Sequence, residues 1–248
     1  SLFKTATSSY NSVDGTPFKR DIIKEIADAC QRNGIKLHLY YSHLDWGRED
    51  YPVGRTGTGT GRPKEKANWP SYYKFMNTQL TELLTNYGKV GAIWFDGWWD
   101  HDSDAKPFDW QLEEQYALIH KLQPQCLVAN NHHHTPFPGE DIQIFERDLP
   151  GENKAGLSGQ SIGRLPLESC QTINEHWGYN ITDTLYKSPK ELIQMLVRAA
   201  GKNANLLLNI GPEPGGALPE LALNRLQSLG KWLNQYGETI YGTRGGFV

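Results

Sequence analysis

The sequence predicts an α/β protein in which helices cover a parallel sheet, and three observations lead to this fold class. Apolar runs of strand length alternate along the chain with segments whose apolar residues recur at helical spacing. The strand-like runs are almost continuously apolar, which is typical of parallel strands buried on both faces. Polar and acidic residues collect directly after these runs, where a (β/α) barrel places its active site. We therefore expect a (β/α) barrel, with a doubly wound open sheet as the alternative.

The first helix and strand are bounded by residues that favour helix ends. Thr16 and Pro17 form a pair typical of an N-cap and a first helical turn. An apolar stripe at helical spacing covers residues 22–30 and stops at Gly34. Residues 35–41 (IKLHLYY) then have the length and the composition of a strand.

The later elements follow the same two periodicities. Residues 54–63 (GRTGTGTGRP) are rich in glycine and predict a mobile loop. The next helix carries its apolar residues between Met76 and Tyr87 and ends at Gly88, before an apolar strand over residues 90–95. The remaining segments are helices over residues 109–122, 192–200 and 218–236, and strands over residues 126–130, 142–145 and 205–210. This count, about five or six strands, falls short of the eight that close a barrel.

Composition excludes several classes of protein. The formal net charge of −3 leaves no basic excess to neutralise phosphates, so no nucleic-acid partner is expected. No apolar run reaches the length of a membrane span, so no membrane partner is expected, and no signal peptide is recognisable. Cys30, Cys126 and Cys170 are too scattered for a disulfide framework, and buried free thiols are expected for the first two.

The run IWFDGWWD, from Ile93 to Asp100, carries the clearest functional signal. A strand ends there in a carboxylate, Asp96, which is followed by glycine, two tryptophans and a second aspartate. Such a carboxylate suits a site that cleaves sugars, because the acid supplies charge and the flat rings match the C–H faces of a pyranose. These residues alone leave open that Asp96 only caps a loop or a helix.

A second carboxylate, Glu146, follows the predicted strand at residues 142–145. Two acids at successive strand ends can face each other, and glycoside hydrolysis uses such a pair. Glu152 and Glu168 compete with Glu146 for the role of general acid. Three further aspartates lie in a polar loop and are expected to be solvated: Asp100, Asp102 and Asp104.

Three consecutive histidines, residues 132–134, follow the strand at residues 126–130. They lack the spacing of a metal motif, and three neighbours on an extended segment cannot all reach one ion. Hydrogen bonds from this loop to sugar hydroxyls are one interpretation and plain surface exposure is another. A metal site is the least favoured.

Four segments, in this order, resemble the α-L-fucosidases of glycoside hydrolase family 29. They are residues 35–46 (IKLHLYYSHLDW), 90–97 (VGAIWFDG), 167–180 (LESCQTINEHWGYN) and 205–244. The resemblance implies a (β/α) TIM-like barrel that hydrolyses α-L-fucosidic bonds of fucosylated oligosaccharides or glycoconjugates with retention. It implies no metal or organic cofactor, and a secreted, periplasmic or lysosomal protein.

The resemblance also assigns roles to single residues. Asp96 matches the family's nucleophile. Glu146 is the best match to the acid/base glutamate, with Glu152 second and Glu168 third. Pocket residues implied by the resemblance, or standing where some members have a pocket arginine, are Tyr40, Trp94, Trp177, His132 and His134.

Two departures from the family pattern bear on the extent of the chain. A His-His-Asp-Gly-Phe motif with fucose-binding histidines is expected just before Ser1, so the first barrel strands are expected to be missing. Residues 1–248 are then expected to be the C-terminal two-thirds of one barrel domain, without the family's C-terminal β-sandwich. Two other classes stay open: a non-catalytic carbohydrate-binding barrel or pseudoenzyme, and a metal-dependent barrel hydrolase that uses residues 132–134.

Overall fold

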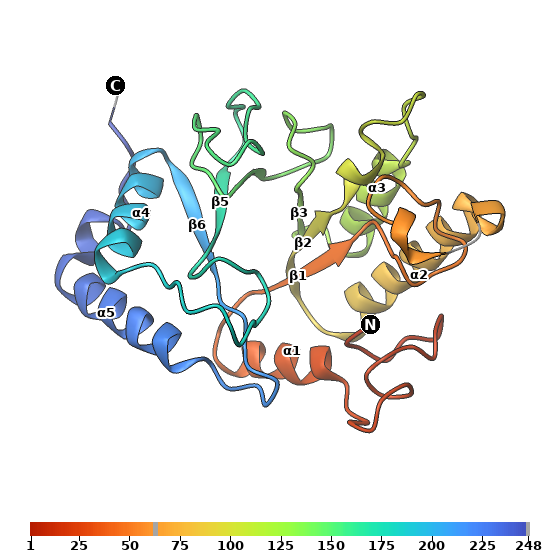
Figure 1. Cartoon of the computed structure of the whole chain (residues 1–248), viewed down its shortest axis with the longest axis horizontal. Coiled ribbons are helices and arrows are strands. Elements are labelled where there is room, and N and C mark those ends of the chain that lie inside the picture. The colour runs from red at the N-terminus through yellow and green to blue at the C-terminus, as the bar shows by residue number, and fades with distance from the viewer. Residues whose placement is uncertain (62–63, 247–248) are drawn as a thin grey trace. The chain divides into compact units, whose positions relative to one another are not determined.

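The structure is a computed structural model that describes residues 1–61 and 64–246 (Figure 1). The chain divides into two compact units: unit 1 comprises Ser1–His132 and Phe137–Asp141, and unit 2 comprises His133–Pro136 and Ile142–Val248. In the described part of each unit the strands form one three-stranded sheet, and all paired strands are parallel. The α/β class and the parallel pairing predicted from the sequence are therefore confirmed.

Unit 1 has the sheet order β1-β2-β3, and helices connect its successive parallel strands. The last residues of neighbouring strands lie side by side, since Ser42 pairs with Asp96 and Phe95 with Asn130. The elements of unit 1 are α1 (Ile22–Arg32), β1 (Leu37–Ser42), η1 (Thr58–Thr60), η2 (Lys64–Lys66), α2 (Trp69–Asn86), β2 (Val90–Asp96), η3 (Trp98–His101), α3 (Leu112–Leu122) and β3 (Leu127–Asn130). Arg62 and Pro63, in the loop predicted to be mobile, lie outside the described residues.

The start of α1 differs from the prediction that Thr16 and Pro17 begin the first helix. Thr16 instead donates its hydroxyl to the carbonyl of Ser12 at 2.6 Å, and Lys19 has a φ of 55°, which is incompatible with a continuing helix. Asp21 is the N-cap, because its side chain accepts a hydrogen bond from the backbone N–H of Lys24 at 2.9 Å. A carboxylate cap close to the apolar stripe therefore outcompetes the earlier Thr-Pro pair.

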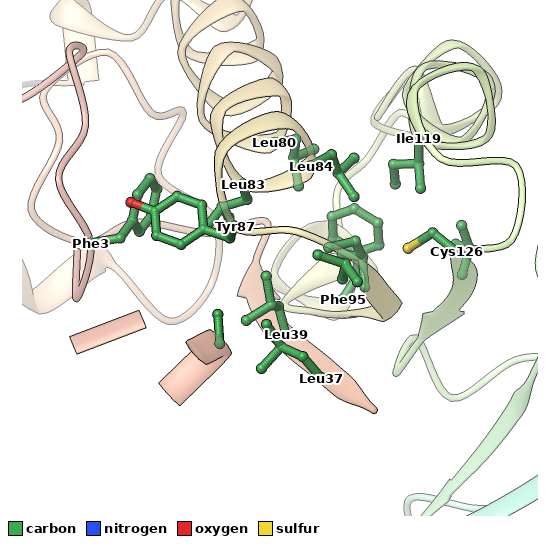
Figure 2. Packing of buried hydrophobic residues seen from close by; sticks show 14 of the residues in the cluster. Phe3, Leu37, Leu39, Leu80, Leu83, Leu84, Tyr87, Phe95, Ile119 and Cys126 are labelled. Atoms are coloured by element: carbon green, nitrogen blue, oxygen red, sulfur yellow. The ribbon is translucent and has the colours of Figure 1, made fainter. Parts of the chain in front are cut away.

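The core of unit 1 lies where α2 and α3 pack against the sheet (Figure 2). Leucines of α2 recur every three or four residues, so they share one face of the helix and point toward side chains of β1 and β2. Each large apolar side chain buried in this way stabilises the fold by about 1.5–3 kcal/mol. The labelled members of this core include Leu37, Leu39, Leu80, Leu83, Leu84, Phe95, Ile119 and Cys126.

Unit 2 has the sheet order β4-β5-β6, with α4 packed on β6 and α5 packed on α4. Ser188 begins α4 through a capping box with Glu191, in which each side chain binds the other residue's backbone N–H. A small core of Ile173, Leu192 and Ala222 joins these layers. The elements are β4 (Gln143–Glu146), β5 (Leu167–Thr172), α4 (Pro189–Gly201), β6 (Ala204–Asn209), α5 (Glu220–Tyr236) and η4 (Gly237–Thr239).

Strand β5 was not predicted, because its sequence LESCQT is polar. Its polar side chains are nevertheless buried and paired, which removes most of the cost of burying them. Glu168 accepts a hydrogen bond from Asn205 of β6 at 3.0 Å, and Ser169 donates its hydroxyl to the carbonyl of Asp148. A buried strand of this kind cannot be recognised from hydrophobic periodicity.

The described residues show how the helices compare with a membrane span, whether metal ligands cluster, and how the cysteines are buried. Each helix among them is too short or too polar to cross a bilayer. In that part of the chain no three His, Cys, Asp or Glu side chains gather into a group that could hold a metal ion. Cys126 is a buried free thiol as predicted, whereas Cys30 is half-buried at the edge of the core.

Candidate active site

Asp96 is the last residue of β2, and three side-chain donors hold its carboxylate. The hydroxyl of Tyr40 donates to Oδ2 at 2.8 Å. The indole N–H of Trp99 and the amide of Asn131 donate to Oδ1 at 2.9 Å and 3.3 Å. Because donors from three separate segments contact both oxygens, the carboxylate is fixed in one orientation.

The turn after Asp96 depends on Gly97. This glycine has a φ of 94°, and a Cβ there would lie only 2.9 Å from the side chain of Leu44. The turn leads directly into η3, whose first residues bring Trp99 back over Asp96. The glycine in the DGWW sequence is therefore required for the indole to reach the carboxylate.

Several aromatic side chains lie close to Asp96. Tyr40 and Trp94 pair across β1 and β2, and their rings stack with centroids 5.7 Å apart. A cavity of about 510 Å³ in unit 1 is lined by Asp96 together with rings from several segments. Its lining residues are Tyr10, Tyr40, Ser42, Leu44, Asp45, Trp46, Gly47, Asp96 and Trp99. The carboxylate of Asp96 thus lies at the wall of a cavity with aromatic side chains.

Asp100 is completely buried, so the prediction that it is solvated is wrong, whereas Asp102 and Asp104 are exposed. Its carboxylate accepts hydrogen bonds from the hydroxyl of Tyr51 at 2.7 Å and from the backbone N–H of Thr56 at 2.8 Å. Burial opposes ionisation, but hydrogen bonds from Thr56 and Tyr51 outweigh it and hold the pKa of Asp100 below its usual range. Asp100 thus anchors part of the glycine-rich loop that was predicted to be mobile.

Glu146 is the last residue of β4 in unit 2, and its partner is His133, which was not among the predicted pocket residues. The Nε2 atom of His133 lies 2.9 Å from Oε2 of Glu146. The side chains of His133 and Glu146 are 19% and 15% exposed, so both are partly accessible. His133 has a φ of 66°, a left-handed conformation that turns its side chain away from the course of its neighbours. Glu146 is thereby positioned at the carboxyl end of its strand.

Trp177 lies in the same unit, after β5. The guanidinium of Arg147 lies over its ring, 5.1 Å from the centroid, and donates to the carbonyl of Glu175 at 3.0 Å. Asn209, at the end of β6, donates to the carbonyl of Trp177 at 2.7 Å. The loop that carries Trp177 is therefore tied to the carboxyl ends of two strands.

The histidine segment separates into different environments. His132 is buried, and its Nε2 lies 3.1 Å and 3.0 Å from the two carboxylate oxygens of Glu140. This placement favours a role in anchoring the loop rather than contact with a sugar. His134 is exposed.

The two competing glutamates occupy structural positions. Glu168 is buried near the start of β5 and pairs with Asn205. Glu152 forms ion pairs with Lys154 and Arg198. Burial raises the pKa of Glu152, but the hydrogen bond from Lys154 and the charges of Arg198 and Lys154 outweigh it, so the pKa lies below its usual value. A general acid must carry a proton near the working pH, which argues against Glu152 in that role.

Replacing Glu152 by glutamine tests this interpretation. A lowered pKa in the folded state contributes stability that is present above the ordinary pKa of 4.5 and is lost as the pH falls through the folded-state value. We expect Glu152→Gln to lower Tm near neutral pH by roughly 2–4 °C, since a partly exposed ion pair contributes at most about 1 kcal/mol. Thermal unfolding of both proteins over a pH series measures this. An unchanged difference at low pH would contradict the ion-pair explanation.

Three contacts of the site were not predicted from the sequence, and they involve Trp99, Asn131 and His133. Trp99 and Asn131 contact Asp96, and His133 contacts Glu146. The position of Asn131 immediately after β3, next to the end of β2, was the available signal, because parallel strands align their carboxyl ends. Nothing in the sequence indicates which of three histidines turns toward Glu146.

Comparison with known proteins decides the family. The α-L-fucosidase family model matches residues 1–238. The chain belongs to the α-L-fucosidase family. The resemblance predicted from four sequence segments is therefore confirmed.

Relatives agree with this assignment. A putative α-L-fucosidase of Caenorhabditis elegans is 28% identical over 244 residues, which cover 95% of this chain and 46% of the relative. The structure of α-L-fucosidase isoenzyme 1 from Paenibacillus thiaminolyticus matches with a TM-score of 0.83 at 34% identity and covers 100% of this chain and 60% of that one. An α-L-fucosidase of Lactobacillus casei, solved as a variant in complex with Fuca(1,6)GlcNAc, matches with a TM-score of 0.74 at 26% identity, covering 96% of this chain and 72% of that one. The chain spans about half the length of the curated relatives it matches.

Proposed function

We propose that this protein hydrolyses α-L-fucosidic bonds with retention of configuration and that Asp96 is its nucleophile. The observation that carries the proposal is the carboxylate of Asp96, oriented by Tyr40, Trp99 and Asn131 at the wall of an aromatic cavity. A nucleophile must present one oxygen to the anomeric carbon in a defined direction, and these donors supply that orientation. Membership of the α-L-fucosidase family supports α-L-fucose as the sugar that is released.

The proposed reaction has two steps. Asp96 attacks the anomeric carbon and forms a fucosyl ester, while Glu146 donates its proton to the departing glycosidic oxygen. Glu146 then removes a proton from water, which attacks the same carbon and releases fucose and the free carboxylate of Asp96. Neither step needs a metal or an organic cofactor. His133 orients the carboxyl of Glu146 for both transfers.

The remaining residues serve the binding of substrate in this proposal. Tyr40 contacts the fucose near the reaction centre while it holds Asp96, and Trp94 supports the ring of Tyr40 from behind. Trp177 packs near the methyl group of the sugar. His134 binds sugar hydroxyls, and His132 acts through the anchored loop.

The fold and the context of the substrate are part of the same proposal. We infer that the chain belongs to a (β/α) TIM-like barrel domain, which the TM-score of 0.83 to a fucosidase structure supports. The substrate class is a fucosylated oligosaccharide or glycoconjugate, as the complex of a relative with Fuca(1,6)GlcNAc suggests. The proposed compartment is secreted, periplasmic or lysosomal, in line with relatives named plasma and tissue fucosidases.

The stereochemistry of the first product tests the function. With an aryl α-L-fucoside as substrate, proton NMR is expected to detect α-L-fucose before mutarotation produces the β anomer, because two displacements restore the configuration. The β anomer appearing first would overturn the retaining mechanism. Saturable binding without turnover would favour a carbohydrate-binding module. Loss of turnover on chelation would favour a metal-dependent hydrolase.

A further inference from the structure

Trp46 is an exposed tryptophan that the proposed chemistry does not use. It follows β1 in the sequence, 51% of its surface is accessible, and it lines the same cavity as Asp96. A large ring left exposed is informative, because burying it elsewhere would have stabilised the fold. Its indole N–H donates to the hydroxyl of Thr56 at 3.2 Å, which leaves the ring faces for another contact.

The position of Trp46 is fixed by the buried anchor around Asp100. Thr56 accepts from Trp46 and also donates its hydroxyl to the carboxylate of Asp100. The backbone N–H groups of Gly54 and Thr56 bind the same carboxylate at 3.2 Å and 2.8 Å. A side chain at Gly54 would collide with the backbone and the carboxylate of Asp100, so this close approach requires glycine. The exposed ring of Trp46 is therefore held, through Thr56, by the buried carboxylate of Asp100, which distinguishes it from a freely rotating surface side chain.

The same loop also supports Trp99. The guanidinium of Arg55 lies 5.5 Å from the ring centroid of Trp99, and the backbone N–H of Arg55 donates to the carbonyl of Asp100 at 2.9 Å. Successive residues, Arg55 and Thr56, thus hold two indoles of one cavity. Trp99 faces Asp96, whereas the hydrogen bond of Trp46 is to Thr56.

We propose that Trp46 is the platform for the sugar to which the fucose is bonded. This inference rests on the proposed function and names the second part of the same site. The cavity of about 510 Å³ falls within the roughly 300–1,000 Å³ that binds drug-sized ligands, and is larger than a single sugar ring requires. Tyr40 and Trp99 donate hydrogen bonds to the reacting carboxylate, whereas the indole N–H of Trp46 donates to Thr56, so the ring of Trp46 is the one left in this cavity for the leaving-group sugar. The ligand class is a hexopyranose that stacks its apolar C–H face on the indole.

The test compares two substrates that differ in the leaving group. α-L-fucosyl fluoride has no sugar to stack on Trp46, whereas Fuca(1,6)GlcNAc has one. Trp46→Ala is expected to lower kcat/KM for the disaccharide by roughly fivefold more than for the fluoride, chiefly through KM, because a stacked ring contributes about 1 kcal/mol, which corresponds to that fold-change. Trp46→Phe keeps a ring and is expected to restore part of the loss. Trp232→Ala, which removes a half-buried tryptophan of α5, is the matched control and should leave the ratio of the two substrates unchanged.

The outcomes separate this inference from the function on which it rests. If the wild-type protein turns over neither substrate, the proposed function fails. If it turns over both and Trp46→Ala lowers both kcat/KM values equally, the ring is structural and the platform is overturned. The platform is also overturned if Trp46→Ala changes neither kcat/KM value.

Discussion

Replacing Asp96 by alanine is expected to lower kcat for an aryl α-L-fucoside by on the order of 10⁴-fold, because the substitution removes the carboxylate that forms the proposed covalent intermediate. Steady-state rates measure the loss. The fold should be retained, since Asp96 is only half-buried and its three donors can bind water instead. Asp28→Ala, at an exposed carboxylate of α1 that pairs with Lys24, is the matched control and should keep full turnover.

A second measurement distinguishes a lost nucleophile from a damaged site. Azide added to Asp96→Gly is expected to attack the anomeric carbon from the vacated side and to yield a fucosyl azide of inverted configuration. Turnover of Asp96→Ala within tenfold of the wild type would rule out Asp96 as the nucleophile. Absence of the azide product, with an unchanged Tm, would have the same meaning.

Replacing Glu146 by glutamine is expected to act according to the leaving group. For a sugar leaving group, which needs a proton, kcat/KM should fall by roughly 10²–10⁴-fold. For a dinitrophenyl leaving group, which departs without a proton, the first step should change little. The basic limb of the pH–rate profile should also flatten, because that limb reports loss of the acid's proton. Rates with the two substrates over a pH series measure both effects.

Glu152→Gln is the control for the substitution of Glu146. Glu152→Gln removes a carboxylate already committed to Lys154 and Arg198 and should leave the leaving-group dependence unchanged. If Glu152→Gln rather than Glu146→Gln abolished turnover of the sugar substrate, Glu152 and not Glu146 would be the general acid. A crystal structure should then be examined for the separation expected of a retaining pair, about 5–5.5 Å between the carboxyl groups.

Local patterns predicted most of the secondary structure correctly. β2 was predicted over 90–95 and is observed over Val90–Asp96, and the helix expected to end at Gly88 is α2. These elements follow from periodicity because their apolar faces point into the core of their own unit. β5 could not be found in this way, since its buried side chains are polar and are satisfied by partners such as Asn205 and Asp148. Pairing across strands is invisible to a local window of sequence.

In the candidate site, too, some features follow from local sequence and others depend on distant residues. Asp96 was found because a carboxylate after an apolar strand is a local signal, and Gly97 and the tryptophans reinforced it. Asp100, four residues later, was misjudged as solvated, because its burial depends on Tyr51 and Thr56, far away in the sequence. Polarity of a loop segment does not reveal which of its charges is enclosed.

What can be read from the chain alone is therefore the α/β alternation, the carboxylates at strand ends and the family to which they point. The folded structure was needed to identify the donors that orient Asp96 and the histidine that contacts Glu146. It was also needed to connect Trp46 with its buried anchor. The physical reason is that strand and helix periodicities are properties of neighbouring residues. Burial, hydrogen-bond partners and the shape of a cavity arise only when distant segments come together.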